Sequence, residues 1–144
     1  MSPNDRPEKL AGALAAILGL LTLGTGVYFA AIRPAMLPED ERLTGVNVES
    51  LPPAFTGWLS IVFRTWAGFT IAFGFLLIAL GVFLRTNDPR WIRGGIATSV
   101  LIAFGSFLAS NVQIGSDFIW FIALLFALAG CTAIAMLRAG MRKP

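Results

Sequence analysis

Long apolar stretches without a charged residue recur four times along the chain. They cover residues 10–32, 65–84, 94–116 and 118–137, and charged residues bracket each of them. Crossing ~30 Å of hydrocarbon at about 1.5 Å per residue takes roughly 20 apolar residues in a helix. Because lipid offers no partner for an open backbone amide, each stretch is predicted to be helical. The pattern predicts an all-α membrane protein with four transmembrane helices in an antiparallel bundle.

Turn signals refine these boundaries and leave one long connection. We expect a single domain over residues 1–144, with spans at about 10–32, 57–84, 91–112 and 117–138. The external loop 33–56 carries an acidic run after Pro38 that is typical of the first turn of a short helix. A new helix is expected to start near Pro52–Pro53 and to run through Trp58 into the second span. Alternatively, residues 54–63 lie along the headgroup region.

The other two connections are short. Between the second and third spans, Asp88 can cap a helix whose first-turn residue is Pro89, which predicts a tight antiparallel hairpin of these two spans. Between the third and fourth spans, Gly115 can take a positive φ, and Ser116 or Asp117 can cap the next helix. The third and fourth spans are therefore also expected to be neighbours.

Basic residues are unevenly distributed between the two sides of four spans. Three lie on the side of the long loop: Arg33, Arg42 and Arg64. Eight lie on the side of the termini: Arg6, Lys9, Arg85, Arg90, Arg93, Arg138, Arg142 and Lys143. The positive-inside rule then places both termini in the cytoplasm. The basic pI near 9.8 therefore reflects orientation in the lipid bilayer, and nucleic acid is not an expected partner.

The location in the cell is inferred from the first span and the tails. The apolar run of the first span exceeds the usual length of a signal-peptide core, so we expect an uncleaved helix. Short tails without an organelle-targeting segment favour a bacterial cytoplasmic (inner) membrane.

Composition excludes most familiar chemistry. The chain is 56% apolar and 13% charged, with no histidine and one cysteine, Cys131. It cannot supply a Ser-His-Asp triad, a His-ligated haem or zinc site, or an internal disulfide. We therefore expect no catalytic residue, no metal and no cofactor, and interpret Cys131 as a small apolar filler. No charged residue lies in the middle of a span, which argues against an ion-coupled carrier.

A polar cluster is predicted at the outer ends of the helices, formed by Arg64, Asn111, Gln113 and Asp117. These residues lie at similar depth, and an ion pair of Arg64 with Asp117 would satisfy both charges. Alternatively, Arg64 extends to lipid phosphates and Asp117 only caps a helix. A functional form of this cluster would bind an anionic headgroup or the loop of a partner.

Small residues at helical spacing form a candidate packing face on the third span: Gly95, Ser99, Ala103, Ser106 and Ser110. Small residues allow close helix approach in lipid, where no hydrophobic force drives association. The other spans offer further small residues: Gly12, Ala16, Gly19, Gly68, Ala72, Ala123, Ala127 and Gly130. The third-span face is expected to pack within the chain or to mediate contact with another protein.

Two functions from different classes follow. The first is a non-enzymatic interaction or accessory subunit of a membrane assembly, or a homo-oligomer, which would use the third-span face and the acidic external loop. The second is the binding or transport of a lipid or small apolar molecule held between the helices. An enzyme acting on a lipid headgroup would need Glu49, Asp117 or Arg64, and nothing in their spacing recommends it. No residue motif ties the chain to one family.

Overall fold

Helices are the regular elements of the described part of the chain. The computed structural model describes residues 6–87 and 90–141, and no strand occurs among them. Its elements are α1 (Arg6–Ala31), α2 (Pro38–Thr44), the short 3₁₀ helix η2 (Val48–Ser50), α3 (Pro53–Phe83), α4 (Arg90–Ile114) and α5 (Ile119–Met141). The expected all-α class is confirmed.

Four of these helices are long and apolar enough to cross a membrane. They are Glu8–Ala31, Pro53–Phe83, Arg90–Ile114 and Ile119–Ala139, which correspond to the four predicted spans. α3 begins at Pro53 and has 31 residues, so the expected helix that continues through Trp58 is confirmed. At about 1.5 Å per residue, α3 is about 46 Å long and exceeds the hydrocarbon thickness. The short helix expected after Pro38 is also present, as α2.

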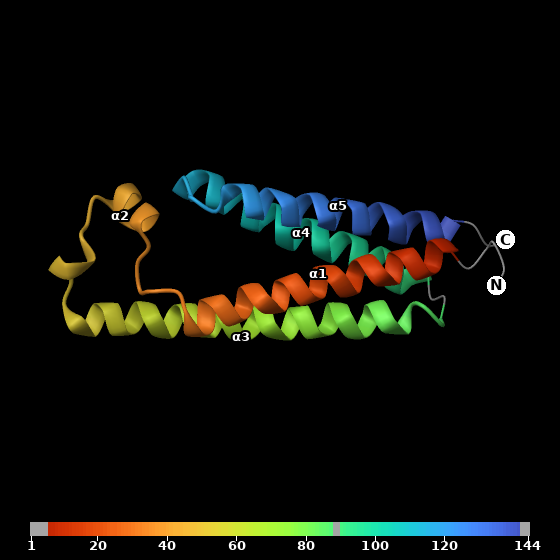
Figure 1. Ribbon diagram of the computed structural model, residues 1–144, viewed down its shortest axis with the longest axis horizontal. Coiled ribbons are helices and arrows are strands. Elements are labelled where there is room, and N and C mark those ends of the chain that lie inside the picture. Colours follow the sequence, from red (N-terminus) through yellow and green to blue (C-terminus); the bar gives the residue numbers. More distant parts are fainter. Residues whose placement is uncertain (1–5, 88–89, 142–144) are drawn as a thin grey trace.

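The long helices associate as two pairs, of which one has the more extensive contact (Figure 1). α1 packs along α3, α4 packs along α5, and α1 also contacts α5. The pairs diverge toward the end of the molecule that carries α2, and α2 contacts α4 there. The described ends of the chain, Arg6 and Met141, lie at the opposite end (Figure 1).

The predicted hairpin of the second and third spans is wrong. α3 packs along α1 and not along α4, although a short connection joins α3 to α4. The expected cap at Asp88 and Pro89 lies outside the described residues. The physical reason for the pairing is that the small-residue face of α3 matches α1, which leaves α4 to pack on α5.

A seam of small residues at intervals of seven holds α1 against α3. On α1 the seam contains Gly12, Gly19 and Gly26, and on α3 it contains Ala67, Gly74 and Gly81. A Cβ added to Gly12 would lie 2.5 Å from the Gly81 carbonyl oxygen, and one added to Gly26 would lie 3.2 Å from that of Ala67. A seven-residue repeat keeps one seam facing a partner helix, and small residues let the backbones approach. The contacts run in opposite directions along the two sequences, so α1 and α3 are antiparallel.

This seam includes only part of the small-residue set expected for these spans. Gly12 and Gly19 lie in it, whereas Gly68 and Ala72 of α3 are exposed. A Cβ added to Gly68 would meet no atom within 4 Å. The α3 residues that contact α1, Gly74 and Gly81, lie on a different face of the helix.

Larger side chains fill the contact between α4 and α5 and join it to α1. The buried cluster includes Ile96, Val100 and Phe104 of α4 with Leu125 and Met136 of α5. Cys131, interpreted from the sequence as a small apolar filler, is exposed on α5 and does not fill the helix interior. Alanines take the neighbouring buried positions of α5.

One arginine is buried at the end of the molecule opposite to α2. Arg93 of α4 is 1% exposed, and its guanidinium donates a hydrogen bond to the Leu84 carbonyl oxygen over 3.4 Å. Burial of a charge requires hydrogen-bonding partners, and the carbonyl groups at a helix C-terminus are suitable acceptors. Arg93 therefore links the start of α4 to the end of α3, even though the two helices do not pack along each other.

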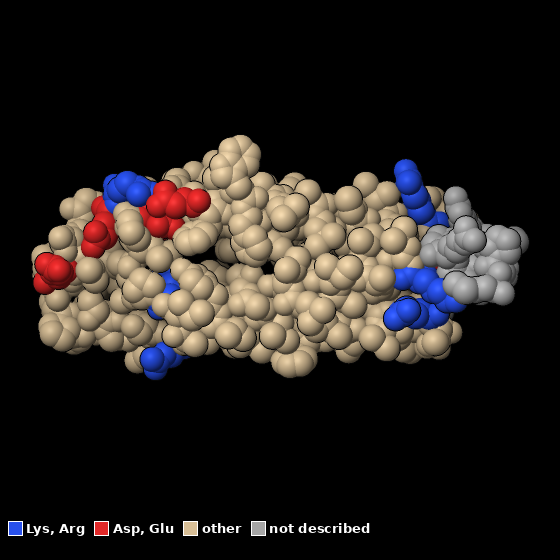
Figure 2. Space-filling model, in the orientation of Figure 1, with Lys and Arg blue, Asp and Glu red and all other residues tan. Residues whose placement is uncertain are grey.

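Charged side chains gather at the two ends of the molecule on the face shown in Figure 2. Acidic residues lie at the end formed by α2 and η2, and basic residues lie both at that end and near the opposite one. The long middle section is uncharged on this face. This distribution has the form that a chain needs if its middle section is to contact lipid.

Candidate functional site

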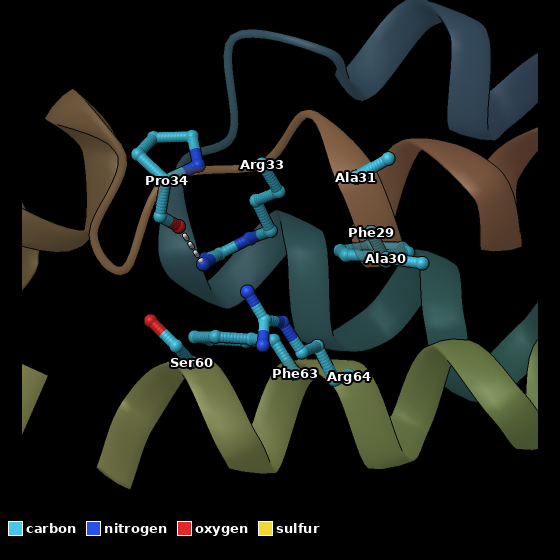
Figure 3. A pocket seen from close by; sticks show the side chains of 8 residues that line it. All are labelled: Phe29, Ala30, Ala31, Arg33, Pro34, Ser60, Phe63 and Arg64. Carbon is cyan, nitrogen blue, oxygen red and sulfur yellow. Dashed lines mark hydrogen bonds between the residues drawn. The ribbon is translucent and has the colours of Figure 1, made fainter. Parts of the chain in front are cut away.

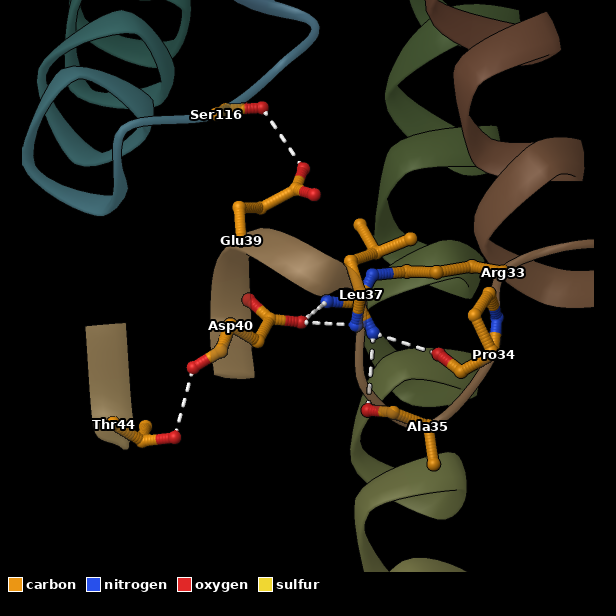
Figure 4. Close-up of polar contacts among 8 residues, drawn as sticks. All are labelled: Arg33, Pro34, Ala35, Leu37, Glu39, Asp40, Thr44 and Ser116. Carbon is orange, nitrogen blue, oxygen red and sulfur yellow. Dashed lines mark hydrogen bonds and ion pairs between the residues drawn. The ribbon is translucent and has the colours of Figure 1, made fainter. Parts of the chain in front are cut away.

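The polar groups of the end that carries α2 are organised around Arg33. We call Arg33, Glu39, Asp40, Arg42, Ser116 and Asp117 the α2-end polar network. Arg33 follows α1, and its Nη2 lies 2.6 Å from the Asp40 carboxylate. Its Nη1 donates to the carbonyl oxygens of Pro34 and Ala35 (Figure 4). Asp40 also accepts the backbone N–H of Leu37 at the start of α2, so one carboxylate joins α1 and α2.

Arg33 also rests on α3. Its guanidinium carbon lies 3.5 Å from the centre of the Phe63 ring, which is a close cation–π contact. The Arg33 side chain is only 5% exposed, and its carboxylate partner is 20% exposed. A buried guanidinium with a carboxylate, two carbonyl groups and an aromatic face is well satisfied. Arg33 therefore fixes the start of the loop between α1 and α3 against α1, α2 and α3.

Two further contacts attach α2 to the turn between α4 and α5. The Ser116 hydroxyl donates to the Glu39 carboxylate over 3.2 Å, and Glu39 is only 2% exposed (Figure 4). Arg42 pairs with Asp117 over 2.7 Å, although both side chains are more than half exposed. Hydrogen bonding to Asp117 raises the pKa of Arg42 above its ordinary value. These contacts place α2 as a bridge between the two helix pairs.

The α4–α5 turn has the geometry that its sequence suggests. Gly115 has a φ of 68°, in the left-handed region that favours glycine. The Ser116 hydroxyl accepts the backbone N–H of Phe118, as expected for a residue that caps the next helix. The turn thereby presents Ser116 to Glu39 and Asp117 to Arg42.

The four residues predicted to cluster at this end do not form one site. Asp117 pairs with Arg42, not with Arg64, because α2 lies over the α4–α5 turn. The Asn111 amide donates to the Phe107 carbonyl of its own helix, and Gln113 is exposed on α4. Arg64 instead lines a pocket between α1 and α3. The sequence predicted the depth of these residues but not their position around the molecule.

That pocket is located where the α1–α3 seam ends. Its walls come from the end of α1, the first loop residues and one turn of α3: Phe29, Ala30, Ala31, Arg33, Pro34, Ser60, Phe63 and Arg64 (Figure 3). Its cavity volume is about 80 Å³, and it opens to the surface on one side. Sequence reasoning counted Arg33 only for topology and missed Ser60 and Phe63. The sequence signal that could have indicated this pocket was Arg33, a second arginine directly after an apolar run.

The predicted packing face of α4 lies on the surface. Gly95, Ser99, Ala103, Ser106 and Ser110 are all exposed, whereas the opposite face of α4 packs into the core through Ile96, Val100 and Phe104. A Cβ added to Gly95 would meet no atom within 4 Å. Packing of this face within the described chain is therefore contradicted. Contact with another molecule is the alternative that is left.

Neither a metal-binding group among the described residues nor a similar protein gives a further indication of function. Among the described residues, no group of three histidine, cysteine, aspartate or glutamate side chains is placed to hold a metal ion. Comparisons with protein-family models, with curated proteins and with solved structures found no match. The exposed α4 face and the pocket are therefore the two features of this chain that bear on its function.

Proposed function

We propose that this chain is a non-enzymatic interaction subunit of a membrane assembly. In the proposed arrangement, the four long helices cross a bacterial inner membrane as an antiparallel bundle with both termini in the cytoplasm. The four apolar helices and the positive-inside rule support this orientation. The partner is a transmembrane helix of another protein or of a second copy of this chain.

The exposed small-residue face of α4 carries this proposal. From Gly95 to Ser110 it contains glycine, alanine and serine at helical spacing, and all five residues are exposed. Small side chains give a lipid chain little contact area, but they allow the backbone of a second helix to approach closely. Serine hydroxyl groups can also form hydrogen bonds between helices. This face therefore suits a protein neighbour better than a lipid neighbour.

Other exposed helix surfaces differ from this face. α3 exposes Trp66, Phe69, Phe75 and Leu76, and α5 exposes Trp120 and Leu124. Large apolar side chains suit contact with acyl chains, and tryptophan favours the membrane–water boundary. This contrast supports the small-residue face of α4 as the surface for association.

A pair of alanine substitutions tests the proposal. Ala103 on the α4 face and Ala127 on α5 are both exposed, so Ala103→Leu and Ala127→Leu enlarge matched surface positions. The full chain is extracted in native lipid with a polymer, and the mass of the intact particles is measured. We expect the unmodified chain and Ala127→Leu to run in a stoichiometric complex, with Ala103→Leu shifted to the single chain.

Two results would overturn this function. One is an unmodified chain that is a single copy without a protein partner in native lipid. The other is a complex that Ala103→Leu leaves intact. The measured mass also tells a second copy of this chain from a different subunit.

A further inference from the structure

The pocket between α1 and α3 contains two arginines with different electrostatic surroundings. Arg33 is neutralised by Asp40, 2.6 Å away, and its Nη1 donates to two carbonyl oxygens. Arg64 is exposed and takes part in neither of the ion pairs found among residues 6–87 and 90–141. Its guanidinium points toward that of Arg33 across the pocket (Figure 3). The two arginines carry two positive charges, and Asp40 neutralises only one of them. The pocket therefore has a net positive charge.

The seam explains why a pocket forms at this point. The next step of seven after Gly26 is Arg33, and the step before Ala67 is Ser60. The repeat of small residues on α1 thus stops at Gly26. Phe29 and Phe63 place large side chains beside the pocket that follows. The helices remain in close contact at Gly26, so the base of the pocket is closed while its outer side is open. The cavity is therefore built into the register of the helix pair.

The depth of the pocket matches the phosphate level of a bilayer. From Arg64 to Phe83 α3 rises about 29 Å, close to the thickness of the hydrocarbon core. Arg64 thus lies at the outer boundary of the hydrocarbon when Phe83 lies at the inner one. The first turns of α3, from Pro53 to Phe63, extend beyond that boundary. A ligand at this depth has its charged group in the interface and its apolar part beside Phe29 and Ala30.

We propose that this pocket binds a phosphate group, with Arg64 as its principal ligand and Arg33 as a fixed second charge. Guanidinium groups bind phosphate oxygens with two parallel hydrogen bonds, and Arg64 has its donors available for this contact. The apolar wall formed by Phe29, Ala30 and Phe63 favours phosphate that is carried by an acidic lipid over free phosphate. The proposal is independent of association through α4, because α1 and α3 form this pocket and α4 does not line it.

A specific site differs from the ordinary extension of an arginine into the headgroups. An arginine on a plain surface meets any phosphate and is insensitive to the shape of its surroundings. Ser60 offers a test of shape, because it lines the pocket without a charge and its hydroxyl donates to the Thr56 carbonyl of its own helix. Ser60→Leu would fill the pocket and leave both arginines in place. Binding at a built site should be sensitive to this substitution.

The experiment compares thermal unfolding of the full chain in uncharged detergent with three additions. These are dioleoylphosphatidylglycerol, dioleoylphosphatidylcholine and sodium phosphate, each titrated against the unmodified chain. We expect phosphatidylglycerol to raise Tm in a saturable way, because a ligand that binds only the folded state stabilises it. Phosphatidylcholine, which has no net charge, should have little effect. An equal increase in Tm with phosphatidylcholine that persists in Arg64→Ala would overturn the proposal.

The variants identify the site. Arg64→Ala should weaken the apparent Kd for phosphatidylglycerol by about tenfold or more, given the strength of hydrogen bonds between charged groups. Ser60→Leu should weaken binding similarly, and Arg64→Lys should weaken it less. Arg42→Ala removes an equal charge from the same end of the molecule but outside the pocket, and should bind as the unmodified chain does.

The outcomes separate the two sources of phosphate and the failure of the idea. If sodium phosphate reproduces an Arg64-dependent increase in Tm, the site is confirmed and free phosphate is sufficient. If only phosphatidylglycerol does so, the site is confirmed and a lipid is the source. If Arg42→Ala weakens binding as much as Arg64→Ala, or Ser60→Leu binds normally, a specific pocket is refuted. Should Arg64→Ala fail to fold, Ser60→Leu and Arg64→Lys decide the matter.

Discussion

Gly19 and Gly74 face one another so closely that neither position has room for a side chain. A Cβ added to Gly19 would lie 2.7 Å from the Gly74 carbonyl oxygen, and one added to Gly74 would lie 2.8 Å from that of Gly19. Because the obstacle in both cases is backbone, a local side-chain movement cannot relieve it. The close approach of α1 and α3 thus depends on both residues.

Gly74→Ala is expected to destabilise the folded chain by about 1–3 kcal/mol, the usual cost of overpacking a tight contact. Gly68→Ala is the matched control on the same helix, since an added Cβ there meets no atom within 4 Å. Thermal unfolding in detergent should show a lower Tm for Gly74→Ala only. Equal Tm values for the two variants would mean that the seam does not hold the helices together.

The seam shows what sequence patterns establish in a chain rich in small residues. Apolar length predicted the four long helices, and Gly12 and Gly19 were correctly assigned to a packing face. Small residues alone did not predict which face of α3 packs on a partner helix. Gly68 and Ala72 lie at helical spacing just as Gly74 and Gly81 do. The shared interval of seven was the stronger signal, since only a matched repeat on both helices keeps one seam in register.

Asp40 and Asp117 both pair with an arginine, and they are expected to differ in importance. The Arg33–Asp40 pair is largely buried, whereas both partners of Arg42–Asp117 are more than half exposed. Asp40→Asn should lower the free energy of unfolding by about 1–3 kcal/mol, because Arg33 would lose its carboxylate. Asp117→Asn should cost about 0–1 kcal/mol. Chemical or thermal unfolding of both variants measures the difference, and a larger loss for Asp117→Asn would contradict this account.

Ser116→Ala is expected to loosen α2 while the centres of the long helices stay unchanged. The substitution removes the hydroxyl that donates to the buried Glu39 carboxylate. Hydrogen exchange followed by mass spectrometry should then be faster across Pro38–Thr44 and unchanged in the centre of α5. If exchange in α2 is as slow as in the unmodified chain, Glu39 and Ser116 do not hold α2 in place.

The polar end shows where sequence reasoning reaches its limit. The depth of Arg64 and Asp117 followed from helix length, but their separation around the bundle depends on which helices pair. The position of α2 over the α4–α5 turn depends on long-range contacts of Glu39 and Arg42, which no local pattern encodes. Arg42 therefore forms the ion pair with Asp117 that was expected of Arg64.

The proposed orientation predicts which positions a membrane-impermeant maleimide reaches. In a Cys131→Ser background, Glu49→Cys should be labelled on intact cells because it lies in the external loop. Arg138→Cys, near the other end, should be labelled only after the membrane is permeabilised. The reverse pattern would contradict the assignment of the termini to the cytoplasm.

The central claim is that another transmembrane helix covers the exposed face of α4. Its most direct test is disulfide cross-linking in native membranes, with Ala103→Cys introduced into the Cys131→Ser background and Ala127→Cys as the exposed control on α5. Mild oxidation should cross-link Ala103→Cys to a second copy, or a short reagent that carries one maleimide and one photoreactive group should link it to one defined partner, and Ala127→Cys should remain a single chain. Equal absence of cross-linking at both positions would contradict the claim.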